Sequence, residues 1–259
     1  MIRLATAAVA IALFLLANHY ELAFELLVLA CAALAAAELA RLSRQPRLGV
    51  SLRAAWVVAL ALLMVLSVGW LGGGWAALAL LLVVPAVRGW SDTVQAWRSA
   101  SLALVAAIWL GALPAALVLL RRGPEGEWIL IWLLGAVALG DTAAYYVGSA
   151  LGQHKLAPAI SPHKTIEGTM AGLLASGGAG LLAAWLFFPA ASLPRMTLVS
   201  LALGAAGQLG DLFESLLKRA AGVKDSGSWL PGHGGLLDRI DAILFAAPVL
   251  LLLKGWALM

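Results

Sequence analysis

Charged residues and glycines gather in one stretch of an otherwise apolar chain, residues 215–241 (SLLKRAAGVKDSGSWLPGHGGLLDRID). The segments on either side are mostly Leu, Ala and Val. Charged groups at a membrane edge are costly and by default mark a functional site. Glycine-rich turns with Lys and Arg suit phosphate oxygens, and carboxylates suit a divalent cation. The stretch therefore predicts a loop that binds phosphate and metal between two membrane-spanning helices.

The segment that leads into this loop carries a polar stripe. Residues at i, i+4, i+7 and i+8 share one face of a helix, and here they are Asp211, Ser215, Lys218 and Arg219. A rise of about 1.5 Å per residue places Asp211 roughly 10 Å below the cytoplasmic surface. Two interpretations remain open for Asp211: a salt bridge to Lys218 or Arg219, or a metal ligand that faces a polar cavity.

The loop itself has the composition of an anion site. Its glycines let backbone N–H groups turn toward an anion, and its basic side chains suit phosphate oxygens. These residues are Gly222, Gly227, Gly232, Gly234, Gly235, Lys218, Arg219 and Lys224. A basic cytoplasmic turn would explain the Lys and Arg residues equally well. It would not explain His233 between two glycines, or Asp225.

Two carboxylates open the apolar segment after the loop. Asp238 and Asp241 are three residues apart and share a helix face, with Arg239 between them. Carboxylates at this position also stabilise a helix N-terminus, which is the purely structural explanation. Because Asp211 precedes the loop and Asp238 follows it, a loop folded back on itself would bring both to one depth. Such a pair predicts a divalent-cation site for phosphoryl chemistry.

A third contribution is predicted from the segment around Asp141. Asp141 and Tyr145 are four residues apart, and Asp141 again lies roughly 10 Å deep by the helical rise. Further along, Ser161 and Pro162 have the residue types of an N-cap and a first helical position, so we expect a helix to begin there. Its N-terminus, with Lys164 and Thr165, would receive a phosphate.

The composition indicates the class of protein that positions these residues. The chain has 259 residues, of which 63% are hydrophobic and 12% charged, and its mean hydropathy is +0.97. These values exclude an ordinary soluble domain and predict an all-α, polytopic integral membrane protein. The single cysteine, Cys31, forms no internal disulfide. No convincing cleavage site follows the apolar run after Arg3, so we expect this run to remain as the first span.

About nine apolar segments approach the roughly 20 residues that a span requires. The first and fourth are short, and each either crosses fully or lies as a tilted or half-inserted helix. We expect residues 1–127 to be a scaffold that makes dimer contacts. Residues 128–259 would form the catalytic part, with cytoplasmic loops at 149–168 and 218–237. The segments are Leu4–Asn18, Ala23–Leu39, Ala54–Leu71, Trp75–Val87, Ser99–Leu120, Trp128–Gly148, Thr169–Ala190, Met196–Leu217 and Ile240–Met259.

The basic residues predict the orientation. With nine spans and a cytoplasmic N-terminus, most of the 17 Lys and Arg residues lie on the cytoplasmic side. The pair Arg121 and Arg122 is a local violation of this rule. Glu25 and Glu38, at the ends of the second segment, are interpreted as charged residues placed at the membrane interface.

The motif resembles the full signature of the phosphatidate cytidylyltransferases, also called CDP-diacylglycerol synthases. It comprises Ser215-x-Leu217-Lys218-Arg219, four residues, Lys224-Asp225-x-Gly227, two residues, and Leu230-Pro231-x-His233-Gly234-Gly235-Leu236-x-Asp238-Arg239-Ile240-Asp241. The stretches Asp141–Tyr145 and Lys155–Gly168 also resemble the family, with small departures at His163 and Ile166. The resemblance covers about the last half of the chain.

The resemblance implies a homodimeric enzyme of the bacterial inner membrane, with its site facing the cytoplasm and no nucleic-acid partner. It would join CTP and phosphatidic acid to give CDP-diacylglycerol and pyrophosphate, with Mg²⁺. In that family the residues that match Asp211 and Asp238 hold the metal centre, and some sites include a potassium ion. Asp141 is then a ligand of a second metal ion or a neighbour of a ligand.

The resemblance also suggests roles for the remaining polar residues. Lys218, Arg219 and Lys224 would stabilise the triphosphate, and Lys164 the lipid phosphate or the triphosphate. His233 either donates to the leaving pyrophosphate or only shapes the glycine turn. Further substrate-binding candidates are Ser215, Asp225, Gly234, Gly235, Arg239, Asp241, Thr165, Ser161 and Tyr145.

Two other functions stay open. The first is a CTP-dependent enzyme that acts on another lipid phosphate or on a polyprenol. The second is a transporter that uses Asp211, Asp238 and Asp141 as a cation path. A carrier is expected to show broken helices near the midplane and often an internal repeat, and the sequence shows neither.

Overall fold

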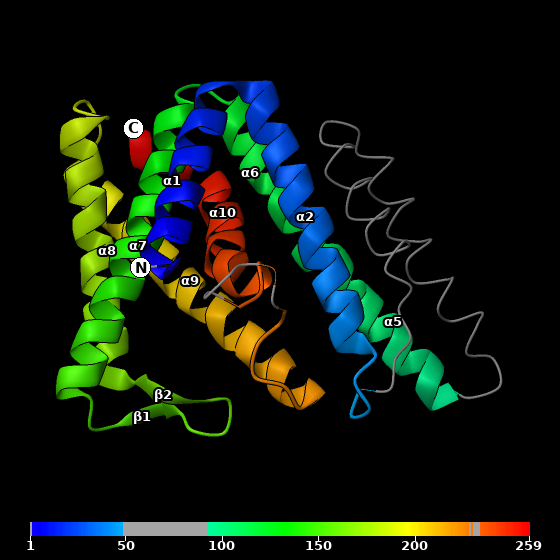
Figure 1. Cartoon of the computed structure of the whole chain (residues 1–259). Helices are drawn as coiled ribbons and strands as arrows, with labels where there is room; N and C mark the ends of the chain where they lie inside the picture. Colours follow the sequence, from blue (N-terminus) through cyan, green and yellow to red (C-terminus); the bar gives the residue numbers. More distant parts are fainter. Residues whose placement is uncertain (1, 49–92, 228, 230–233) are drawn as a thin grey trace. The chain divides into compact units, whose positions relative to one another are not determined.

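The computed structural model describes residues 2–48, 93–227, 229 and 234–259 (Figure 1). These residues form helices and one short β-hairpin, which confirms the predicted all-α class. Six of the described helices are long and apolar enough to cross a membrane, which confirms a polytopic membrane fold. The predicted segments Ala54–Leu71 and Trp75–Val87 lie outside the described residues, so the count of nine spans stays a prediction.

The chain forms two compact units. The first contains residues 1–122 and 217–239, and the second contains residues 123–216 and 240–259. The first unit includes α1 (Ile2–His19), α2 (Glu21–Ser43), α5 (Thr93–Ala107), the π-helix η1 (Ile108–Ala112) and α6 (Leu113–Arg122). The second includes α7 (Gly126–Leu151), β1 (Lys155–Ala157), β2 (Ser161–Thr165) and α8 (Ile166–Leu186). Helices α9 (Leu193–Ala221) and α10 (Leu237–Leu258) contribute residues to both units.

In the first unit, helix α2 packs against α1, α5, η1 and α6. Its buried face follows a three- and four-residue spacing and includes Phe24, Val28, Ala32, Ala35 and Leu39. Helix α5 continues through η1 into α6 as one span. The wider turn of η1 comes just before Pro114, whose missing N–H and bulky ring disturb a regular α-helical ladder.

The two arginines that violate the positive-inside pattern have specific partners in this unit. The Nε of Arg121 donates to the carbonyl of Asn18 at 2.8 Å, and its Nη2 donates to the carbonyl of His19 at 3.1 Å. These carbonyls lie at the C-terminus of α1, where cations are stabilised. The Nε of Arg122 donates to Glu25 at 2.6 Å. The arginine pair therefore joins the end of α6 to α1 and α2.

In the second unit, small residues let α8 pack closely against α7 and α9. A Cβ atom on Gly140 of α7 or on Gly204 of α9 would overlap the Ser176 side chain of α8. The Ser176 hydroxyl donates to the carbonyl of Ala136 at 2.8 Å, and Trp132 donates to the Ser200 hydroxyl at 2.7 Å. Close approach of small residues with interhelical hydrogen bonds is typical of membrane helix packing.

Two predicted boundaries of α8 are wrong. Ser161 and Pro162 do not begin a helix, because they lie in β2, opposite β1 in an antiparallel hairpin. The N-cap is Thr165, whose side chain accepts a hydrogen bond from the N–H of Gly168 at 3.1 Å. At the other end α8 stops at Leu186 and does not continue to Ala190. Pro189 explains this early end, because proline disfavours helical conformation in the residue before it.

The start of α7 offers a test of backbone strain. Glu125 precedes the helix with φ 56° and ψ 21°, a left-handed conformation that costs a non-glycine residue about 1 kcal/mol. Glu125→Gly is therefore expected to raise the melting temperature in detergent by about 2–4 °C. Glu127→Gly, which puts glycine inside α7, is expected to lower it. A lower melting temperature for Glu125→Gly would contradict the strain argument.

Candidate active site

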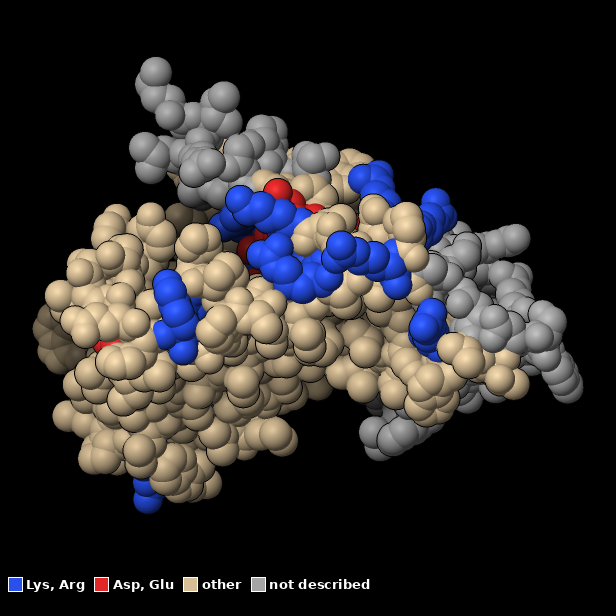
Figure 2. Space-filling view, turned by 90° about the horizontal axis from the view of Figure 1, so that it is seen from below, with Lys and Arg blue, Asp and Glu red and all other residues tan. Residues whose placement is uncertain are grey.

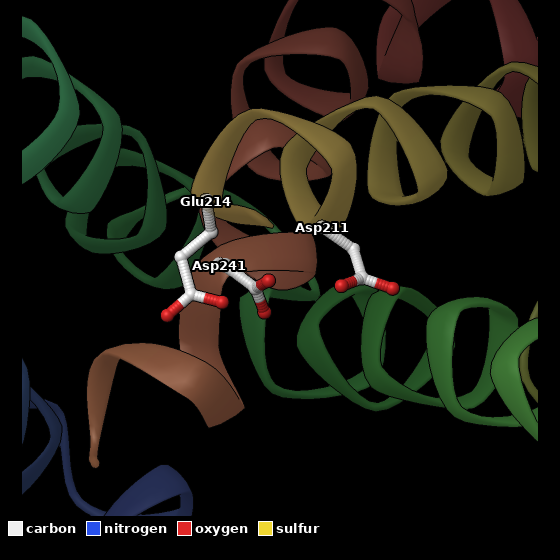
Figure 3. Close-up of side chains that lie close together, drawn as sticks. All are labelled: Asp211, Glu214 and Asp241. Carbon is white, nitrogen blue, oxygen red and sulfur yellow. The ribbon is translucent and has the colours of Figure 1, made fainter. Parts of the chain in front are cut away.

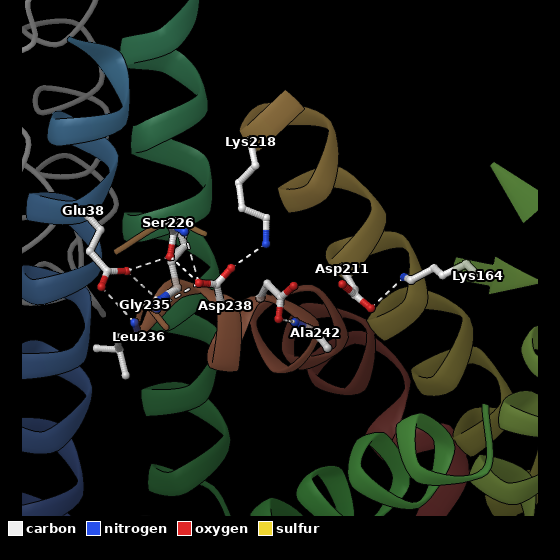
Figure 4. Close-up of polar contacts among 11 residues, drawn as sticks. Glu38, Lys164, Asp211, Lys218, Ser226, Gly235, Leu236, Asp238 and Ala242 are labelled. Carbon is white, nitrogen blue, oxygen red and sulfur yellow. Dashed lines mark hydrogen bonds and ion pairs between the residues drawn. The ribbon is translucent and has the colours of Figure 1, made fainter. Parts of the chain in front are cut away.

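The first unit holds a polar group that we call the Asp238 cluster: Glu38, Lys218, Ser226, Gly235 and Asp238 (Figure 4). Asp238 lies in the first turn of α10, and its Oδ1 is 2.5 Å from the Nζ of Lys218 in α9. Its Oδ2 accepts hydrogen bonds from the Ser226 N–H at 3.1 Å, the Ser226 hydroxyl at 2.9 Å and the Gly235 N–H at 2.9 Å. The Asp238 carboxylate therefore binds residues on both sides of the loop, Ser226 before it and Gly235 after it.

Glu38 brings a second carboxylate to the same cluster from helix α2. The side chain is completely buried, with 0% of its surface exposed. Its oxygens accept hydrogen bonds from the N–H groups of Leu236 and Leu237, both at 2.9 Å. One of these oxygens also lies 3.1 Å from the Ser226 hydroxyl, whose single hydrogen is shared between Glu38 and Asp238. Glu38 thus caps the N-terminus of α10. Its interpretation as a residue at the membrane interface stays a prediction, and in this structure its hydrogen-bond donors come from residues 226, 236 and 237.

Gly235 leaves no room for a side chain in the Asp238 cluster. An added Cβ would overlap the Ser226 hydroxyl and lie 2.7 Å from a Glu38 oxygen. Gly235→Ala is therefore expected to lower kcat/KM about tenfold or more, because a displacement near 1 Å is sufficient to misplace a site. The matched control is Gly255→Ala in α10, where nothing lies within 4 Å of the added atom. Equal activities of the two variants would contradict this prediction.

The second unit holds an acidic cluster of Asp211, Glu214 and Asp241 (Figure 3). One carboxylate oxygen from each residue lies within 4.8 Å of the others. Glu214 is 1% exposed and Asp241 is 5% exposed. Gly210 allows α9 to approach α10 here, since an added Cβ would lie 2.6 Å from the carbonyl oxygen of Asp241. Converging, mostly buried carboxylates have the donor chemistry of a divalent-cation site.

The β-hairpin adds a basic side chain to the acidic cluster. Lys164 of β2 places its Nζ 2.7 Å from the Oδ2 of Asp211 (Figure 4). Glu167 holds the hairpin base, because it accepts from the N–H groups of Gln153 and His154 and lies 2.6 Å from the His154 ring. Asp141 of α7 lies within electrostatic range of both Asp211 and Lys164.

Helices α9 and α10 each carry residues of both clusters. Helix α9 supplies Asp211 and Glu214 to the acidic cluster and Lys218 to the Asp238 cluster, while α10 supplies Asp241 and Asp238. On the face drawn in Figure 2, several Lys and Arg side chains gather beside a few Asp and Glu side chains, and other basic side chains lie apart from this group. Carboxylates beside ammonium groups can bind a polyphosphate and its counter-cation together.

The family model of the cytidylyltransferase family matches residues 1–255 of the chain. The chain belongs to this family. Uncharacterized protein YnbB of Escherichia coli strain K12 is 40% identical over 165 residues, which cover 62% of this chain and 53% of that protein. The phosphatidate cytidylyltransferase of Bacillus subtilis strain 168 is 50% identical over 114 residues, which cover 42% and 41% respectively. That of Staphylococcus aureus strain COL is 48% identical over 128 residues, covering 49% and 48%.

The chain spans about half the length of the curated relatives it matches. The match to the cytidylyltransferase family nevertheless extends to residue 1, so it includes α1 and α2 as well as the motif-bearing half. This is a wider span than the motifs alone indicated. Helix α2, with Glu38, therefore lies within the residues that the family model matches.

The structure brings some of the predicted site residues of this cytidylyltransferase family member together. Asp211 and Asp241 share the acidic cluster, and Lys164 joins them. Lys218, Gly235 and Asp238 share the other cluster. The remaining candidates are not members of either cluster as defined above. Arg219, Lys224, Asp225 and Arg239 are exposed, Ser161, Ser215 and Gly234 are partly buried, and Thr165 is the α8 cap.

The predicted roles of two further site residues, Tyr145 and His233, stay predictions. Tyr145 is 70% exposed and its ring contacts that of Tyr146, so its substrate-binding role stays a prediction. His233 lies outside the described residues, and its two alternative roles stay open. The Gly235 N–H, predicted to face an anionic ligand, donates to Asp238 in this structure.

Sequence reasoning missed Glu38, Glu214 and Ser226. Glu38 did carry a signal, because a carboxylate within a long apolar helix is expensive and usually has a function. Glu214 carried one also, since it lies three residues after Asp211 on the same helix face. Ser226 lies inside the motif, but its contacts to two carboxylates are not readable from the spacing.

Proposed function

We propose that the chain is a phosphatidate cytidylyltransferase, which joins CTP and phosphatidic acid to give CDP-diacylglycerol and pyrophosphate. The observation that carries the proposal is the Asp238 cluster. Apart from Glu38, all of its residues lie within the signature stretch 215–241, and their hydrogen bonds hold that stretch together. Membership of the cytidylyltransferase family and the names of the relatives support it.

We propose Mg²⁺ as the cofactor, with a second cation such as K⁺ as a further component. The acidic cluster fits such an ion, because its donors are hard carboxylate oxygens from two adjacent helices. Asp211, Glu214 and Asp241 would hold it. The roles of Asp238 and Asp141 as ligands stay predictions. When bound, a divalent ion neutralises phosphate charge and orients the triphosphate.

The residues of the chain would act by positioning substrates and neutralising charge. In the proposed reaction an oxygen of the lipid phosphate forms a bond to the α-phosphorus of CTP. The bond between the α- and β-phosphates breaks, and its electron pair leaves with pyrophosphate. The lipid phosphate is already anionic near neutral pH, so the step requires no strong base. Catalysis of this kind rests on alignment and electrostatic stabilisation.

The two paired lysines are suited to holding the phosphates. An ammonium group has three donors, so Lys218 and Lys164 can each keep an aspartate partner and still donate to a phosphate oxygen. We propose that Lys218, with the exposed Arg219 and Lys224, binds the triphosphate of CTP. Lys164 would bind the lipid phosphate or the triphosphate. The site would face the cytoplasm from a bacterial inner membrane, and the protein would act as a homodimer.

The test uses the purified protein in detergent micelles with phosphatidic acid, Mg²⁺ and each nucleoside triphosphate separately. The measured quantities are pyrophosphate and the lipid product. CTP-dependent pyrophosphate with equimolar CDP-diacylglycerol is the expected result. CTP binding without product would contradict phosphatidic acid as the acceptor and point to another lipid phosphate or a polyprenol. Folded protein that binds no CTP would contradict the proposal and favour the transporter.

A further inference from the structure

We infer that Glu38 is a positioning residue: from helix α2 it fixes the N-terminus of α10 and thereby the Asp238 carboxylate. The inference rests on the proposed function, because it concerns the same site. Glu38 lies far outside the signature stretch, 198 residues before Leu236. It therefore ties an N-terminal helix to the geometry of the proposed site.

The first step of the argument concerns the N–H groups at the start of α10. The first N–H groups of a helix have no partner within the helix and require an acceptor. Three consecutive N–H groups are divided between two carboxylates here. That of Gly235 donates to Asp238, and those of Leu236 and Leu237 donate to Glu38. Glu38 therefore sets the position of the backbone immediately before Asp238.

The second step concerns Ser226, which links the two carboxylates. Its hydroxyl oxygen is 3.1 Å from Glu38 Oε2 and 2.9 Å from Asp238 Oδ2, and its N–H also donates to Asp238. Glu38 thus contacts both ends of the loop that runs from Ser226 to Leu237. Gly227 keeps this arrangement tight, because a Cβ there would lie 2.5 Å from the other Glu38 oxygen.

The third step concerns why this residue is a carboxylate. Burial of a charged group is expensive unless hydrogen bonds compensate for lost water. Glu38 accepts two backbone hydrogen bonds, one through each oxygen, and shares the Ser226 hydroxyl with Asp238. A glutamine has only one acceptor oxygen, and its NH₂ group would face a donor. Glu38→Gln therefore keeps the size of the side chain but removes at least one of the contacts that hold the start of α10.

The experiment compares the full-length wild type with Glu38→Gln in micelles. The matched control is Glu25→Gln in the same helix, where the side chain pairs with Arg122. Glu38→Gln is expected to lower kcat about 10- to 100-fold, with KM for CTP changed by less than about threefold. Hydrogen–deuterium exchange at the amides of Leu236 and Leu237 is expected to accelerate. Glu25→Gln is expected to change neither kcat nor the exchange of these amides.

Several outcomes would overturn the inference. Unchanged amide exchange at Leu236 and Leu237 would show that Glu38 does not hold these groups. Faster exchange with a wild-type kcat would show that the position of these backbone groups does not affect catalysis. A loss confined to KM would assign Glu38 to substrate binding. An inactive wild type would contradict the proposed function instead, while amide exchange would still test the Glu38 contacts.

A second variant covers the case in which Glu38→Gln does not fold. Ser226→Ala keeps the backbone contacts of Glu38 but removes the hydroxyl link to Asp238. It is expected to lower kcat about tenfold with little change in KM. If Glu38→Gln folds, the double variant is expected to lose less than the product of the two single losses, since both act on one network. Independent, fully multiplicative effects would contradict the positioning role.

Discussion

Asp211→Asn is expected to lower kcat/KM about 1000-fold or more, which leaves activity near zero. The substitution keeps the shape of the side chain but removes its charge. Asp211 lies 2.7 Å from Lys164 and contributes one of three carboxylates to the acidic cluster. Loss of a single preorganised electrostatic contact commonly costs about 100- to 1000-fold in rate. Here the loss affects both the proposed cation site and the placement of Lys164. CTP-dependent pyrophosphate release by the purified variant measures the effect.

The control for Asp211→Asn is Glu125→Gln, at an exposed carboxylate in the same unit. It is expected to retain activity within about twofold of the wild type. Membrane insertion and elution from a sizing column should be normal for both variants. Substantial Mg²⁺-dependent turnover by inserted Asp211→Asn would remove Asp211 from the proposed cation site.

Asp238→Asn is expected to have an effect of similar size for a different reason. Asp238 uses both oxygens, one toward Lys218 at 2.5 Å and the other toward the donors of Ser226 and Gly235. An asparagine has one acceptor oxygen, so its NH₂ group would face either the ammonium or the loop N–H groups. We expect kcat/KM to fall about 1000-fold, because the variant loses both a charge and contacts that hold Ser226 and Gly235 to residue 238.

Steady-state kinetics with the same pyrophosphate readout test this prediction. Glu21→Gln serves as the control, since Glu21 is an exposed carboxylate in α2 at a distance of 3.7 Å from Arg122. Amide exchange across residues 226–237 should accelerate in Asp238→Asn only. A variant whose amide exchange is unchanged and whose turnover lies within about tenfold of the wild type would contradict a central role for Asp238.

The helical membrane fold followed from the sequence because the lipid environment leaves few alternatives. Backbone groups in a bilayer must be satisfied internally, so long apolar segments become helices. The errors arose where local rules compete. Ser161 and Pro162 suit a helix start, yet pairing with β1 holds them in a strand and moves the cap to Thr165. Local residue preference does not reveal such pairing.

The sequence by itself determined the membrane class and the family, and it predicted much of the candidate site. The motif-bearing residues Asp211, Lys218, Asp238 and Asp241 were identifiable because charges in an apolar chain are costly and their spacing is specific. Only the tertiary structure showed that Glu214 joins Asp211 and Asp241, that Lys164 pairs with Asp211, and that Glu38 caps α10. The physical reason is that hydrogen bonds and ion pairs depend on distance in space. Periodicity reports neighbours within one helix, whereas Glu38 meets Leu237 across 199 residues.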